Sequence, residues 1–221
     1  MLLTSSDERG KPGPRSCAEF ATAKGMEIKY VIDTHIQADH LSGGRSLSER
    51  TGAQYCLHMS ADVGFPFTPQ ADGQELNLGN VTVKVLHTPG HTPESICLLV
   101  TDKTRGPEPW FLLTGDTLFV GAVGRPDLPG SAQENAAHLY DSLKKKILEL
   151  PETLEIYPAH FSGSLCGAGI SGKPMSTLAF EKRWNPTLNL DRSGIVEKMT
   201  SGMPPKPFAM EAILRTNQGR A

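Results

Sequence analysis

The stretch Thr34-His35-Ile36-Gln37-Ala38-Asp39-His40 decides how this chain is interpreted. It follows the apolar run 28–32, and together they predict a buried strand that ends in a loop crowded with possible metal ligands. The stretch departs from the metal-site motif His-x-His-x-Asp-His at Gln37, where the motif has its second histidine. A site for two zinc ions requires that histidine, whereas a site for a single iron does not.

Length and composition are those of one globular domain. The chain has 221 residues, of which 38% are hydrophobic and 21% charged, so it can form a core and wholesale disorder is not expected. The formal net charge of −2 predicts neither a basic nucleic-acid face nor a polybasic membrane anchor. The longest apolar runs are of strand length, far below the ~20 residues of a membrane helix.

Cysteine usage indicates a reducing compartment. The four cysteines form no CxxC pair, which argues against a disulfide framework and against a cysteine-rich zinc site. Residues 1–10 lack the basic start and apolar core of a secretory signal. A cytoplasmic location is therefore expected.

The predicted elements alternate between strands and helices. The polar segment 1–16, rich in Gly and Pro, is expected to be disordered and to precede one domain over residues 17–221. The hydrophobic pattern predicts strands over residues 28–33, 54–57, 81–86, 96–100, 110–113 and 154–157. It predicts helices over residues 17–24, 45–50, 131–150, 177–183 and 194–200. This order is typical of a layered α/β fold whose site gathers on one rim of the sheets.

Four loops that follow predicted strands carry imidazole or carboxylate side chains. They hold His35, Asp39 and His40; His91; Asp116; and His160. Zinc, iron and manganese accept such ligands, and softer sulfur ligands are lacking. One histidine after a strand is more often a hydrogen-bonded structural residue, as expected for His58 and His87. Four such loops in this order are strong evidence for a metal site.

The chain resembles the metallo-β-lactamase superfamily from about Met26 to the C-terminus. The segments that carry the resemblance are THIQADHLSGG, HTPGHTPES, LTGDTLF, VGRPD and YPAH. The most similar branch holds the persulfide dioxygenases (sulfur dioxygenases) and the glyoxalase II thioesterases. The resemblance implies an α/β fold, an αββα sandwich with the metal between the sheet edges. About thirty residues precede the strand at Ile28, so either the strand pair that usually comes first in the family is missing or another segment covers that edge; we expect a homodimer or marginal stability.

Glyoxalase II-like members bind two metals, and the matching residues here fall into two sets. The first set is His35, Gln37, His91 and Asp116. The second set is Asp39, His40, His160 and the shared Asp116. Gln37 weakens the first set, because a neutral amide oxygen is a poorer donor than imidazole for these metals.

Persulfide dioxygenases bind one iron(II) through three residues, which match His35, His91 and Asp116 here. Two histidines and one carboxylate leave three coordination positions open for the substrate sulfur and dioxygen. The resemblance therefore implies one Fe(II) per chain and the oxidation of glutathione persulfide, or a similar small persulfide, to sulfite and thiol. The residues expected to orient the ligands and the bound water are Gln37, Asp39, His40 and His160.

Two alternatives to this function stay open. One is a thioester hydrolase that uses Zn(II) and a glutathione thioester, and the other is a degenerate relative that retains its metal. Arg125 matches a family arginine that binds the glutathione portion, with an ion pair to Asp127 as the alternative. Cys166 and Lys173 are further candidates for contacting the substrate, although a plain loop cysteine and a solvated lysine are the commoner roles.

Overall fold

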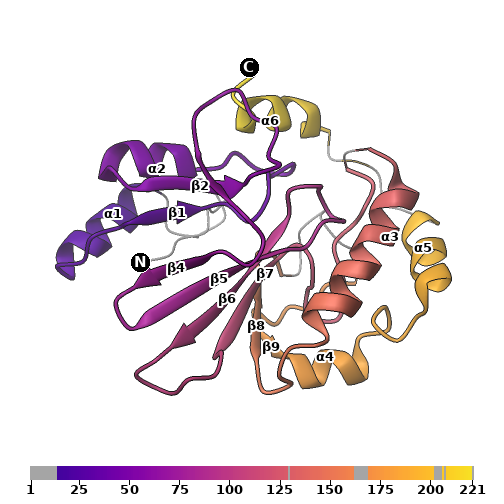
Figure 1. Ribbon diagram of the computed structural model, residues 1–221. Coiled ribbons are helices and arrows are strands. Elements are labelled where there is room, and N and C mark those ends of the chain that lie inside the picture. The colour runs from indigo at the N-terminus through magenta and orange to yellow at the C-terminus, as the bar shows by residue number, and fades with distance from the viewer. Residues whose placement is uncertain (1–13, 129, 162–168, 202–205, 207, 221) are drawn as a thin grey trace.

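The computed structural model describes residues 14–128, 130–161, 169–201, 206 and 208–220 (Figure 1). They form two sheets. The larger sheet has the order β4(Glu75–Leu78), β5(Val81–His87), β6(Ile96–Asp102), β7(Phe111–Gly115), β8(Glu155–Pro158) and β9(Ser176–Thr177). The smaller has the order β1(Tyr30–Ile32), β2(Gln54–His58) and β3(Thr68–Gln70), all parallel.

Helices cover the outer faces of both sheets (Figure 1). Those beside the smaller sheet are α1(Pro14–Ala23) and α2(Gly44–Thr51). Those beside the larger sheet are α3(Ala132–Ser142), which continues as the π-helical turn η1(Leu143–Ile147), α4(Leu178–Trp184) and α5(Arg192–Thr200). The last helix, α6(Met210–Asn217), lies beyond β2 at the top of the view. The four layers confirm the expected αββα sandwich.

Three apolar cores separate the four layers, and the alternation of side chains along each strand explains them. In the smaller sheet Val31 and Leu57 pack toward α1 and α2, whereas Ile32 and Cys56 pack toward the larger sheet. The run Ile96–Val100 is buried on both faces of β6, as its continuous apolar sequence predicts.

Most predicted elements are confirmed within a few residues, and two expectations need correction. The helix expected over residues 131–150 leaves α-helical geometry after Ser142 and ends as a π-helical turn at Ile147. The helix α1 begins at Pro14, inside the segment expected to be disordered, because the fixed φ of proline suits a first helical turn. Residues 1–13 of that segment lie outside the described residues.

In the described part of the chain, the first strand of the smaller sheet is β1. Between residue 14 and β1, the described chain contains one regular element, the helix α1. Within the ranges given above, β1 pairs with β2 alone. No helix among the described residues is long and apolar enough to cross a membrane.

Candidate metal centre

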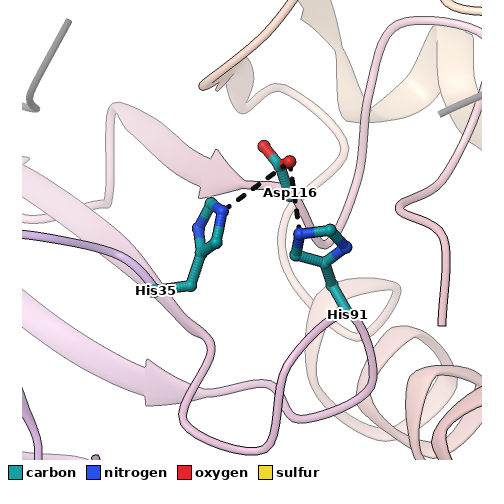
Figure 2. Close-up of side chains that lie close together, drawn as sticks. All are labelled: His35, His91 and Asp116. Carbon is teal, nitrogen blue, oxygen red and sulfur yellow. Dashed lines mark ion pairs between the residues drawn. The ribbon is translucent and has the colours of Figure 1, made fainter. Parts of the chain in front are cut away.

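Three buried side chains from separate loops converge where the two sheets meet. His35 follows β1, His91 follows β5, and Asp116 follows β7. Figure 2 shows both imidazoles pointing toward the Asp116 carboxylate. Each residue is about 1% exposed, so bulk water does not compete for their polar atoms.

The spacing of these three groups suits a metal ion. The Oδ2 atom of Asp116 lies 3.7 Å from Nε2 of His35 and 3.4 Å from Nε2 of His91. Ligand atoms at right angles around an ion ~2.1 Å away would lie roughly 3 Å apart. A small closing movement therefore brings the three atoms to coordination distance.

Neighbouring groups fix which nitrogen of each imidazole faces the centre. Nδ1 of His91 lies 2.9 Å from the backbone carbonyl of Arg125. Because a carbonyl only accepts, Nδ1 carries the proton and Nε2 keeps its lone pair toward Asp116. Nδ1 of His35 contacts the Thr34 hydroxyl, which can donate or accept, at 3.1 Å, and Nε2 of His35 faces Asp116.

The charge states of the cluster also fit a divalent metal. Burial lowers the pKa of His35 to about 3, so its imidazole is neutral near pH 7. Burial opposes ionisation of Asp116, but attraction to His160 and His35 outweighs it and lowers the pKa of the carboxyl below its usual range. A neutral imidazole and a carboxylate are the forms that bind metal.

Some buried polar atoms at the site have no hydrogen-bond partner within the described part of the chain. They are Nε2 of His35, Nε2 of His40 and Oε1 of Gln37. Buried polar groups are nearly always paired, so such atoms call for a further partner. A bound metal supplies that partner for the imidazole nitrogens.

A second group, Asp39, His40 and His160, adjoins the first and could also hold a metal ion. Nδ1 of His40 lies 2.9 Å from Oδ1 of Asp39, and Nε2 of His160 lies 3.3 Å from Oδ2 of Asp39. Nδ1 of His160 lies 2.8 Å from Oδ1 of Asp116, which joins the two groups. Burial raises the pKa of Asp39, yet its hydrogen bond with His40 and attraction to His160 bring the pKa below its usual range.

Three residues that support the site, Glu94, Gly124 and Asn217, were not predicted from the sequence. The Glu94 carboxylate accepts the backbone N–H of Ile36 at 2.9 Å, which fixes the loop beside His35. Gly124 permits the close approach of two loops, because a Cβ there would lie 1.9 Å from the Asp116 carbonyl oxygen. Asn217 binds the same ligand loop from α6. Glu94 lies within the segment HTPGHTPES, and that position was the available signal for its role.

The residues expected to contact the substrate have different outcomes. Arg125 is buried, and its guanidinium binds Asp127 through Nε at 2.7 Å and Nη2 at 2.8 Å. These contacts match the alternative role of Arg125, an ion pair with Asp127. Lys173 is exposed. Cys166 lies outside the described residues.

Comparisons with known proteins identify the family. A family model described as the metallo-beta-lactamase superfamily matches residues 12–160. The chain belongs to this superfamily. It is 30% identical to the human persulfide dioxygenase ETHE1, mitochondrial, over 90% of this chain and 73% of that protein. Bacterial hydroxyacylglutathione hydrolases also match, at 28% and 30% identity.

Two solved structures of the superfamily share the fold of this chain. The structure of ETHE1 from Myxococcus xanthus matches with a TM-score of 0.80 and 27% identity, over 100% of this chain and 88% of that one. A metallo-beta-lactamase from Staphylococcus aureus matches with a TM-score of 0.89 and 31% identity, over 100% of this chain and 65% of that one. The chain is therefore a metalloenzyme of the superfamily that is similar to persulfide dioxygenases.

The remaining strand histidines lie outside both groups. His58 and His87 stack at a ring-centroid distance of 3.7 Å, and each has a hydrogen-bond partner, as the sequence predicts. Burial and the neighbouring His87 lower the pKa of His58 to about 4. As the pH falls from 6.5 to about 4, the unfolded chain gains a proton that the folded chain excludes at this position.

The stacked pair of His58 and His87 should make the free energy of unfolding depend on pH. The free energy of unfolding should fall between pH 7 and pH 5, and this fall should be smaller in His58→Gln than in the wild type by about 1–2 kcal/mol. One pKa unit corresponds to about 1.4 kcal/mol. Urea unfolding of the metal-free protein at both pH values measures this, with His138→Gln, an exposed position on α3, as the control. An unchanged pH dependence in His58→Gln would refute the assignment.

Proposed function

We propose that the chain is a mononuclear iron(II) persulfide dioxygenase. It would oxidise glutathione persulfide, or a similar low-molecular-weight persulfide, to sulfite and the free thiol. The observation that carries the proposal is that His35, His91 and Asp116 bring two imidazole nitrogens and one carboxylate oxygen within 4.8 Å of one another. Two histidines and one carboxylate are typical of non-haem iron(II) oxygenases. The similarity to ETHE1 proteins supports the same function.

The metal held by these three residues would supply a binding position for the persulfide sulfur and for dioxygen. The overall reaction balances when the outer sulfur takes both oxygen atoms of dioxygen and a third from water. The S–S bond breaks and the inner sulfur leaves as the thiol. Dioxygen is the oxidant, so no further electron donor is required.

The protein's own side chains prepare the site for this reaction. The Arg125 carbonyl holds the His91 ring in one tautomer. Nδ1 of His160 lies 2.8 Å from Oδ1 and 3.1 Å from Oδ2 of Asp116, and Oδ2 also faces the other two imidazoles. The burial of the ligands keeps bulk water away from the reacting sulfur.

The oligomeric state, the residues that contact the substrate and the cellular location are also part of this proposal. A second copy of the chain would pair along β1, whose single strand partner in the described residues is β2. Arg125 would reach the substrate only by leaving Asp127, whereas Lys173 is already accessible. A cytoplasmic location stays a prediction, because the human relative is named as mitochondrial.

A thioester hydrolase is the second candidate. The observation that favours it is the group of Asp39, His40 and His160, which could hold a second ion beside Asp116. Two ions sharing a carboxylate can activate water and polarise a carbonyl. The missing imidazole at Gln37 weakens the neighbouring position, so we rank this function below the dioxygenase.

An oxygen-uptake assay separates the two functions. Iron-loaded protein should consume dioxygen and release sulfite when given glutathione persulfide. His91→Ala should abolish this activity because two protein ligands hold iron poorly, and His138→Ala should keep it. No oxygen uptake by the iron-loaded protein, together with hydrolysis of S-lactoylglutathione by zinc-loaded protein, would contradict the dioxygenase.

Single substitutions test the ligand assignment independently of activity. His35→Ala, His91→Ala and Asp116→Ala should each lose bound iron. Gln37→Ala should retain most of its iron, because a neutral amide oxygen is a poorer donor than imidazole or carboxylate for iron. Iron per folded chain after gel filtration is the measurement. Equal loss from Gln37→Ala and His91→Ala would show that Gln37 is a ligand.

A further inference from the structure

Helix α6 binds the loop of residues 34–42, called here the ligand loop, through the side chain of Asn217. Its Oδ1 accepts the backbone N–H of Ser42 at 2.9 Å. Its Nδ2 donates to the carbonyls of Gln37 and His40, both at 2.9 Å. One carboxamide thus uses both of its N–H donors and its oxygen on a single loop. The three contacts lie on either side of Asp39 in the sequence.

The rest of α6 contributes little to the apolar core. No residue of the helix is fully buried. Polar contacts hold its end, where the Gly64 N–H donates to the Gln218 carbonyl at 2.8 Å and Arg220 pairs with Asp62. Changes at Asn217 should therefore leave the sandwich folded.

The two halves of the ligand loop are fixed from different parts of the fold. In the first half, the Thr34 carbonyl accepts the backbone N–H of Ile96 at 2.8 Å, and Glu94 accepts that of Ile36 at 2.9 Å. These contacts come from β6 and the turn before it. In the second half, residues 37–42, Asn217 on α6 binds the backbone at three points, and the Ser42 hydroxyl also binds Asp33.

The geometry points to Asn217 as a positioning residue for the metal centre. It holds the Asp39–His40 part of the loop where Asp39 meets His160, and His160 in turn holds Asp116. Asn217 binds backbone atoms of the loop, so it acts through the ligand groups and does not touch the reacting atoms. The inference rests on the metal site of the proposed function and holds whether that site takes iron or zinc.

Two substitutions distinguish hydrogen bonding from mere shape. Asn217→Ala removes all three contacts. Asn217→Asp keeps the size and the acceptor for Ser42, but it loses both donors and places a carboxylate oxygen against two carbonyl oxygens. Thr216→Ala is the matched control, because Thr216 is exposed and its hydroxyl bonds to Ala212 within α6.

Hydrogen exchange followed by mass spectrometry tests the contacts directly on the full-length, metal-free chain. Exchange of the Ser42 amide should rise at least tenfold in Asn217→Ala, which removes the acceptor of that N–H, while residues 94–98 stay protected. Cobalt(II), a spectroscopic probe of the site, should bind both Asn217 variants roughly tenfold more weakly, as is usual when a group that orients metal ligands is lost. Thr216→Ala should match the wild type in both measurements.

Three results would overturn the inference. They are unchanged exchange of the Ser42 amide in Asn217→Ala, an equal rise in Thr216→Ala, and wild-type cobalt affinity in Asn217→Asp. Circular dichroism confirms that each variant is folded before these comparisons. A wild-type chain that binds no cobalt would instead contradict the metal site itself, and the exchange data would still decide whether Asn217 holds the loop.

Discussion

The candidate site depends on one buried carboxylate, Asp116. Its Oδ2 faces the imidazoles of His35 and His91, and its Oδ1 accepts a hydrogen bond from His160. Burying a carboxylate is costly unless it is paired; His160 pairs with Asp116 here, and a metal bound beside His35 and His91 would pair with it further. Through His160, Asp116 also adjoins the second candidate group of Asp39, His40 and His160. The adjoining loop can approach it closely because Gly124 carries no side chain.

The fold positions this carboxylate by bringing strand ends from both sheets together. Residues far apart in sequence hold the ligand loop: Glu94 and Ile96 come from the larger sheet, and Asn217 comes from the last helix. Rigid placement of ligands by such supporting groups sets metal affinity and geometry. The position of His35 thus depends on contacts from β6 and the turn before it, whereas the positions of Asp39 and His40 depend on contacts from α6.

Sequence patterns predicted the parts of the molecule that are locally encoded. The run Ile96–Val100 is apolar throughout, and it forms a strand buried on both faces. The elements that were missed carry weak local signals: β3 is three residues long with a central proline, β4 has four residues of which one is buried, β9 has two residues, and α6 buries none of its side chains. The loops that gather the ligands were predicted, but the contacts of Asn217 span some 180 residues of sequence. The pairing of Arg125 with Asp127 was left open because it depends on burial, which the motif alone does not encode.

The central claim is that the chain holds one metal ion, bound by His35, His91 and Asp116. Metal analysis of the folded wild-type chain, loaded with excess iron(II) and then passed through gel filtration, tests this claim most directly. The account predicts close to one iron per chain. A value close to two would mean that Asp39, His40 and His160 hold a second ion, and it would contradict the mononuclear centre.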